Sequence, residues 1–122
     1  MSRILLVDDD DPLRNILRVT LEKMGHHVVE ARNGKEALRL CQAEPPDIVL
    51  TDIVMPEAEG IELIGALRRF HSDVKIIAMS GGGRVSAADY LKIARHMGAT
   101  IALAKPFSQE AIAAAIAKVS GT

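Results

Sequence analysis

Three aspartates stand at the ends of two short apolar runs in this sequence. Asp8 and Asp9 follow the run at 4–7, and Asp52 follows the run at 48–51. If both runs are parallel strands of one sheet, their carboxyl ends share an edge and the three carboxylates converge. Carboxylates that lie close together resist joint ionisation, so a cation among their oxygens accounts for the grouping. Mg²⁺ suits such a site, because this ion binds one or two carboxylates together with waters and phosphate oxygens.

A hydroxyl and an amine stand at the ends of two later runs. Ser80 follows the run at 75–79, and Lys105 follows the run at 100–104. Phosphoryl transfer requires an in-line nucleophile and cations around the phosphoryl oxygens, and a carboxylate can be that nucleophile. The lysine would offset the charge of the phosphoryl group, and the hydroxyl would supply a hydrogen bond that exists only in the modified state. These side chains therefore predict a phosphoryl-transfer site that acts as a switch.

The elements that must position these residues alternate along the chain. Strands are predicted at 4–7, 27–31, 48–51, 75–79 and 100–104, and most of these runs are continuously apolar, as in strands buried on both faces. Segments with helical spacing lie between them. Five strand–helix units predict a doubly wound α/β fold with a parallel sheet, in which ligands bind outside the carboxyl ends of the strands.

Several residues mark where the predicted helices begin and end. Pro12 suits a first helical position and Gly25 suits a stop, while Asn33 suits an N-cap. The third helix is expected to begin near Gly60, and the fourth to end at Gly98. The first helix is expected to bury one face, made of Leu13, Ile16, Leu17, Leu21 and Met24, and the last helix to bury Ile112, Ala115, Ile116 and Val119.

Composition limits the class of protein. The chain has 122 residues, enough for one domain with a core, and it is 48% hydrophobic but only 2% aromatic. A net charge of −1 gives neither a nucleic-acid footprint nor a polybasic membrane signal. The single cysteine, Cys41, is expected to pack half-buried on a helix and fits a reducing compartment. With no signal-peptide pattern and no apolar stretch of membrane-spanning length, we expect one soluble cytoplasmic domain over 1–122.

Four motifs together resemble the receiver domain of two-component response regulators, in particular the single-domain chemotaxis type. They are Leu6-Val7-Asp8-Asp9, Thr51-Asp52-Ile53-Val54-Met55-Pro56, Met79-Ser80-Gly81 and Lys105-Pro106-Phe107. Their order and spacing span the chain. The resemblance implies a flavodoxin-like (βα)5 three-layer sandwich with a five-stranded parallel sheet in the order 2-1-3-4-5.

The resemblance also implies a role for each site residue. Asp52 would accept a phosphoryl group from a sensor histidine kinase or a histidine phosphotransfer protein. Lys105 would contact the phosphoryl oxygens, helped by a cis bond to Pro106, and Ser80 would be drawn onto the modified group. For Mg²⁺, the implied ligands are Asp9 directly, Asp8 mainly through a bound water, Asp52, and the backbone carbonyl of Val54.

The sequence departs from the family pattern at the signal readout. Receivers often place an aromatic switch residue three positions before the lysine, where this chain has Ala102. Either movement of the Ser80 loop is read directly, or Tyr90 substitutes. Val54 and Gly82 offer no group to position a hydrolytic water, so the resemblance implies slow self-dephosphorylation.

The last helix carries small residues outside its apolar face: Ala111, Ala113, Ala114 and Ala117. Ala is the best helix former, which accounts for them in one interpretation. In the other, they form a docking face with Ala102 and Ala104. The resemblance implies that the last strand and the last two helices bind a downstream protein target or a second copy of the chain.

Three alternatives to a stand-alone switch remain. The chain could be the receiver of a longer regulator with a DNA-binding output domain, or a receiver that binds partners without phosphorylation. A phosphatase of the haloacid dehalogenase type requires a second aspartate two residues after the nucleophile, and Val54 occupies that position. We therefore expect a switch and not an enzyme.

Overall fold

The structure is a computed structural model. It describes residues 2–53, 59–71, 73–80, 89, 92, 95, 96, 98–105 and 108–120. The elements, in chain order, are β1 (Arg3–Val7), α1 (Asp11–Lys23), β2 (His27–Ala31), α2 (Gly34–Ala43), β3 (Ile48–Asp52), α3 (Glu59–Phe70), β4 (Lys75–Ser80), β5 (Ile101–Ala104) and α5 (Gln109–Ser120).

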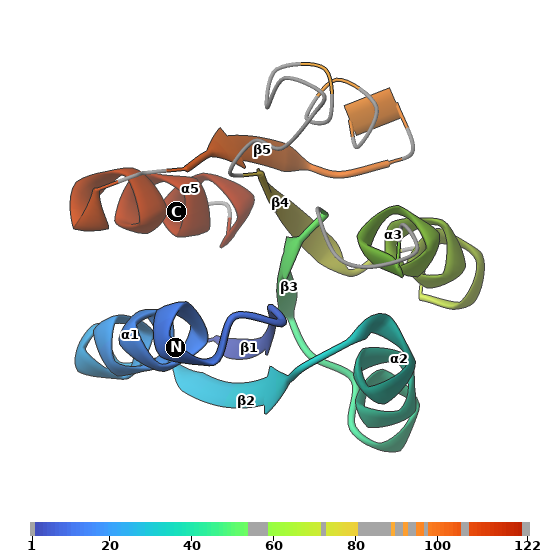
Figure 1. The fold of residues 1–122 in the computed structure, drawn as a ribbon, viewed down its shortest axis with the longest axis horizontal. Helices are drawn as coiled ribbons and strands as arrows, with labels where there is room; N and C mark the ends of the chain where they lie inside the picture. The colour runs from blue at the N-terminus through green and yellow to red at the C-terminus, as the bar shows by residue number, and fades with distance from the viewer. Residues whose placement is uncertain are drawn as a thin grey trace.

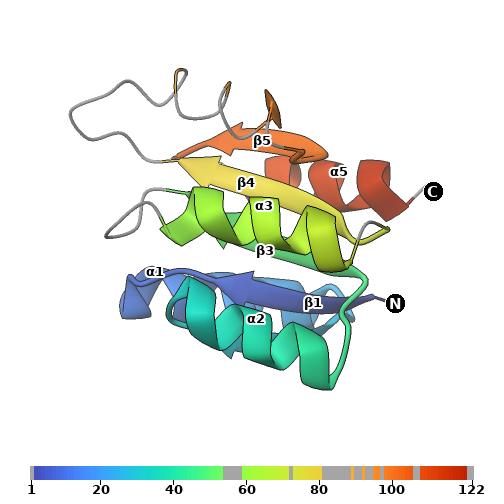
Figure 2. The same ribbon diagram turned by 90° about the vertical axis from the view of Figure 1, so that its right-hand side faces the viewer.

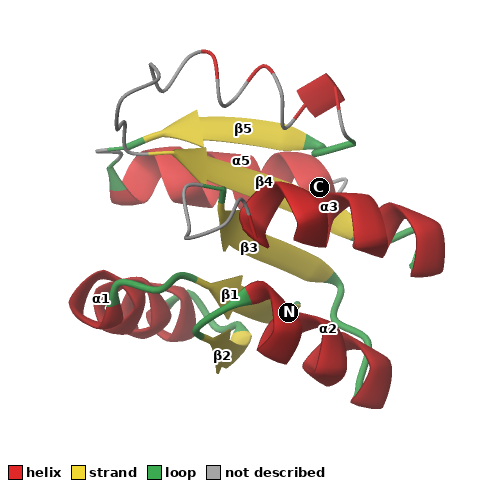
Figure 3. Cartoon of the chain, turned by 45° about the vertical axis from the view of Figure 1, so that its right-hand side comes forward, coloured by secondary structure: helices red, strands yellow, loops and turns green. Residues whose placement is uncertain are grey.

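The strands form one parallel sheet in the order β2-β1-β3-β4-β5. Helices α1 and α5 cover one face of the sheet, and α2 and α3 cover the other (Figure 1). Viewed from the side, the strand arrows point toward the same end of the sheet (Figure 2). The sheet therefore lies between two helix pairs (Figure 3), which confirms the predicted doubly wound fold and its strand order.

Each face of the sheet has its own apolar core. On one face, residues of β1, β3 and β4 pack against α2 and α3, and Cys41 and Leu67 are buried there. On the other face, alternate residues of the same strands pack against α1 and α5, with Leu21 and Ile116 in this second core. Because the central strands face a core on both sides, β3 is buried along its whole length.

Two packing predictions were wrong in detail. Cys41 is fully buried, where a half-buried position was expected. The predicted apolar face of α1 was too wide, since Ile16 is 61% exposed and Met24 is 36% exposed, whereas Leu17 and Leu21 are buried. The four apolar residues predicted for the last helix are all buried.

The predicted stop of α1 at Gly25 and the predicted Asn33 cap of α2 are confirmed, while α1 begins at Asp11, one residue before the predicted Pro12. Asp10 caps α1 by accepting from the Leu13 amide at 3.1 Å, and Asn33 caps α2 by accepting from the Glu36 amide at 2.8 Å. Gly25, just past α1, has a φ of 94°, a value that favours glycine.

The predicted fourth helix, with Tyr90, lies largely outside the described residues. Within the part of the chain that the structure covers, no helix is both long and apolar enough to cross a lipid bilayer.

Candidate functional site

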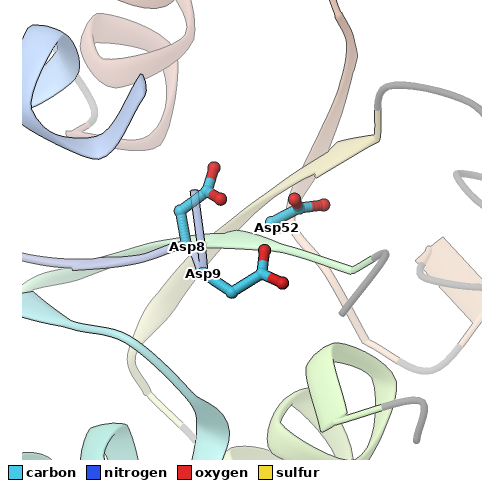
Figure 4. A group of neighbouring side chains, drawn as sticks. All are labelled: Asp8, Asp9 and Asp52. Carbon is cyan, nitrogen blue, oxygen red and sulfur yellow. The ribbon is translucent and has the colours of Figure 1, made fainter. Parts of the chain in front are cut away.

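Asp8, Asp9 and Asp52 form a cluster at the carboxyl ends of β1 and β3. One carboxylate oxygen from each residue lies within 4.8 Å of the others. In Figure 4, the carboxylate of Asp9 points toward that of Asp52, and Asp8 lies beside them. Asp8 is 0% exposed and Asp52 is 5% exposed, whereas Asp9 is exposed. The predicted convergence of these three side chains is confirmed.

Strand register brings the carboxylates together. β1 and β3 pair with Val7 beside Thr51, so the next residues, Asp8 just past β1 and Asp52 at the end of β3, lie at the same level. The amide of Asp8 also donates to the Ala31 carbonyl at 3.2 Å, which ties the end of β1 to β2.

Lys105 lies between two of the carboxylates. Its Nζ donates to Asp8 Oδ2 and to Asp52 Oδ2, each at 3.1 Å. Burial alone would lower the pKa of Lys105, but the charges of Asp52 and Asp8 outweigh it, so the pKa is raised above its ordinary value. Lys105 is therefore a cation at neutral pH and offsets part of the charge of the cluster.

Ser80 ends β4 beside Lys105, whose amide donates to the Ser80 carbonyl at 2.7 Å. The side chain of Ser80 is fully buried. Its Oγ has no hydrogen-bond partner among the described residues. A buried hydroxyl without a partner is costly, so this atom can gain a bond to any acceptor that reaches it.

Two hydrogen bonds and one close packing contact hold the backbone at Asp52. Thr51 Oγ1 donates to the Asp52 carbonyl at 3.0 Å, and the Ile53 amide donates to the Met79 carbonyl at 2.9 Å. In addition, Gly60 of α3 packs so closely against this strand end that a Cβ built on it would lie 2.4 Å from the Asp52 carbonyl oxygen. The position of the Asp52 side chain is therefore set by a tightly packed strand end.

The donor set fits a magnesium ion. It offers three hard carboxylate oxygens, the type of ligand that Mg²⁺ prefers. Ligands on opposite sides of Mg²⁺ lie about 4.2 Å apart, at about 2.1 Å from the ion on each side. The carboxylate oxygens of the cluster lie within 4.8 Å of one another, close to that separation.

The sequence identified, through its strand ends, the five residues described above: Asp8, Asp9, Asp52, Ser80 and Lys105. Val54 and Pro106, together with the glycines at 81–83, lie outside the described residues. The sequence reading missed the close approach of Gly60. It also missed Arg14, which contacts the Asp8 carbonyl. The sequence signal for this contact is an arginine in the first turn of a helix that begins at the last of four consecutive aspartates.

The chain is similar to known proteins of one family. Residues 4–117 match the family model described as response regulator receiver domain. The chain is 44% identical over 86 residues to the response regulator receiver protein CpdR of Brucella abortus, covering 70% of this chain and 72% of that protein. It is 36% identical to the chemotaxis protein CheY of Halobacterium salinarum, over 97% of this chain and 96% of that protein.

A solved structure has the same fold. The response regulator receiver domain protein of Clostridium thermocellum superposes with a TM-score of 0.88 at 26% identity, covering 98% of this chain and 94% of that chain. Several transcriptional regulators also match, and the chain spans less than half of their length. From the matched family model, the relatives and the fold together, the chain belongs to the response regulator receiver domain family.

Proposed function

We propose that this chain is a phosphorylation-dependent signalling switch with Asp52 as the phosphoacceptor. Receiver domains of two-component response regulators are signalling switches, and this chain belongs to that family. The observation that carries the proposal is the placement of Lys105 Nζ 3.1 Å from both Asp8 and Asp52, inside a cluster of three carboxylates. A cation in that position would offset the negative charge of the oxygens of an incoming phosphoryl group.

The proposed donor is the phosphohistidine of a sensor kinase or of a phosphotransfer protein. A carboxylate oxygen of Asp52 attacks phosphorus in line with the P–N bond. The O–P bond forms as the P–N bond breaks, and the electron pair of that bond stays on the imidazole nitrogen. The other ring nitrogen carries a proton, so a neutral imidazole leaves. The product is an acyl phosphate on Asp52.

Lys105 supports the transfer through its charge. Its ammonium already contacts Asp52 Oδ2, so it lies within reach of the equatorial oxygens of a phosphoryl group attached to that carboxylate. The raised pKa of Lys105 keeps it charged throughout the neutral range. Positioning and electrostatic stabilisation are the main contributions that a protein makes to this reaction.

Asp8, Asp9 and Asp52 would hold Mg²⁺, with the Val54 carbonyl proposed as a further ligand. When bound, the ion supplies positive charge next to the phosphoryl oxygens. Asp8 is anchored for this role, because its Oδ1 accepts from the Asp10 amide at 2.9 Å while its Oδ2 accepts from Lys105.

Ser80 is the proposed reporter of the modified state. Its buried Oγ would gain a phosphoryl oxygen as acceptor, so the modified state would be favoured by a contact that the unmodified state does not make. The proposed consequence is a change at the adjoining surface, where β5 and α5 carry exposed Ala104, Ala114 and Ala117. A downstream protein target or a second copy of the chain would bind there.

Phosphorylation of Asp52 is tested by intact mass after incubation with acetyl phosphate, with and without Mg²⁺. We expect a Mg²⁺-dependent phosphoryl adduct in the wild-type chain and none in Asp52→Asn, because the amide is not a nucleophile. Asp47→Asn, an exposed aspartate at the opposite end of β3, is the matched control and should keep the adduct. A folded wild-type chain that takes no phosphoryl group from acetyl phosphate or from a phosphorylated kinase would contradict the proposal.

A further inference from the structure

Arg14 is a cation at a place where a helix disfavours one. It is the fourth residue of α1, and the amino end of a helix carries partial positive charge. Its side chain is nevertheless only 11% exposed. A guanidinium held in such a position depends on specific partners, and one of them is a backbone carbonyl in the loop after β1, which carries Asp8 and Asp9.

All three nitrogens of the guanidinium are engaged. Nη1 donates to the backbone carbonyl of Asp8 at 2.8 Å, Nε donates to Glu30 Oε1 at 3.1 Å, and Nη2 contacts Asp11 Oδ1 at 2.7 Å. Burial would lower the pKa of Arg14, but the hydrogen bonds to Asp11 and Glu30 outweigh it and leave the pKa raised. Because the guanidinium is planar and rigid, contacts in three directions fix its orientation.

The carbonyl that Arg14 holds belongs to the peptide unit between Asp8 and Asp9. A peptide unit is planar, so a fixed carbonyl oxygen also sets the direction in which the chain continues to Asp9. Asp9 is exposed, and among the described residues no hydrogen bond or ion pair holds its carboxylate. The Asp10 amide also closes this turn by donating to Asp8 Oδ1 at 2.9 Å, but among the described residues Arg14 alone donates a hydrogen bond to the carbonyl of the Asp8–Asp9 peptide.

We propose that Arg14 is a positioning residue for the cation site, which orients Asp9 toward Asp52 through the Asp8–Asp9 peptide. This inference rests on the proposed function, since it assumes that the carboxylates hold Mg²⁺. The ion requires near-octahedral geometry, so a ligand that is already oriented binds it more tightly than one that must first be ordered. Groups that hold metal ligands in place typically change metal affinity by about 10-fold or more when they are removed.

Arg18 provides a matched control one helical turn later. It also contacts Glu30, at 3.3 Å, and it donates to Glu22 and Asn15, each at 2.8 Å. None of its contacts reaches Asp8 or Asp9. Arg14 and Arg18 therefore share a carboxylate partner and a helix, but only Arg14 touches the loop that bears the proposed metal ligands.

The experiment is a calorimetric titration of Mg²⁺ into the wild-type chain, Arg14→Ala, Arg14→Lys and Arg18→Ala. The unfolding midpoint of each is measured without metal as a control for folding. We expect Arg14→Ala to raise the Kd for Mg²⁺ by about 10-fold. Arg18→Ala should change the Kd for Mg²⁺ by less than about 2-fold, because ion pairs that face solvent contribute little energy. Arg14→Lys should bind as weakly as Arg14→Ala, because a lysine keeps the charge but not the three-way fork.

A second readout separates positioning from loss of structure. The rate of phosphorylation by acetyl phosphate is followed as a function of Mg²⁺ concentration. For Arg14→Ala we expect the Mg²⁺ midpoint to rise by about 10-fold while the rate at saturating Mg²⁺ stays at the wild-type value, since Arg14 touches no reacting atom.

The remaining outcomes contradict either the proposed function or the role of Arg14. A wild-type chain that binds no Mg²⁺ and takes no phosphoryl group overturns the proposed function itself. A functional wild type together with unchanged Mg²⁺ affinity in folded Arg14→Ala and Arg14→Lys overturns the role of Arg14 alone. Wild-type affinity in Arg14→Lys, or an equal loss in Arg18→Ala, would show that charge or helix stability acts and would also overturn the positioning role.

Discussion

Ser80 and Thr51 are buried hydroxyl residues on neighbouring strands, and their environments differ. Thr51 Oγ1 donates to the Asp52 carbonyl at 3.0 Å, whereas Ser80 Oγ has no partner among the described residues. A hydroxyl that is satisfied contributes to stability, and one that is buried without a partner does not. At the scale of single residues, the Ser80 hydroxyl, which has no partner among the described residues, is the group that the proposed phosphoryl oxygen would satisfy.

This difference predicts opposite effects of two substitutions on the unmodified protein. Ser80→Ala should leave the free energy of unfolding unchanged or raise it by up to about 1 kcal/mol, because it removes an unsatisfied buried hydroxyl. Thr51→Val should lower it by about 1 kcal/mol, because the Asp52 carbonyl loses a donor. Urea unfolding without a phosphodonor measures both. If Ser80→Ala is destabilised as much as Thr51→Val, the Ser80 hydroxyl has a partner in the unmodified state.

At the scale of elements, the contact between α3 and the end of β3 decides where Asp52 lies. Gly60 sits in the first turn of α3, and a Cβ on it would lie 2.4 Å from both the Asp52 carbonyl oxygen and Ile53 Cα. Both are backbone atoms, which cannot rotate away as the end of a side chain can. The close approach thus depends on the absence of a side chain at this position.

Gly60→Ala is therefore expected to lower the free energy of unfolding by about 1–3 kcal/mol, as overpacking does. It should also slow phosphorylation of Asp52, since α3 and the strand end must move apart. Gly65→Ala in the middle of α3 is the matched control, where alanine is the better helix former. Urea unfolding and intact mass measure the two effects. Equal stability of Gly60→Ala and the wild-type chain would show that the helix shifts at no cost.

At the scale of the whole molecule, one contact between segments far apart in the sequence depends on pH. The Ser2 amide donates to His26 Nδ1 at 3.2 Å, which connects the turn after α1 to the start of β1. Only a neutral imidazole can accept this bond. Burial also lowers the pKa of His26 below its ordinary value of 6.5.

The sign of the pH effect follows from that shift. As the pH falls through 6.5, the unfolded chain takes up a proton at His26 before the folded chain does, so stability is lost until the pH reaches the lowered pKa. We expect the unfolding temperature to fall less between about pH 7.5 and about pH 5 in His26→Asn than in the wild-type chain. The Asn oxygen can still accept from Ser2. Exposed His27→Asn is the control and should match the wild type. Equal slopes for His26→Asn and the wild type would contradict the assignment.

The sequence by itself determined the fold class and the identity of most site residues. Continuous apolar runs separated by helical spacing require strands buried on both faces, and parallel strands place their carboxyl ends on one edge. Asp8, Asp9, Asp52, Ser80 and Lys105 follow such runs, so their types and positions were enough to predict where they meet.

Only the tertiary structure decided the distances and the supporting contacts. Lys105 reaches Asp8 across 97 positions of the sequence, and no periodic pattern contains the register and packing that bring the two together at 3.1 Å. The same holds for Arg14 on the Asp8 carbonyl and for Gly60 against Asp52. Ile16 and Leu17 are adjacent and equally apolar, yet the packing of neighbouring elements buries only Leu17. Local pattern determines which residues can face a core or an edge, whereas the contact that each one makes depends on segments far away in the chain.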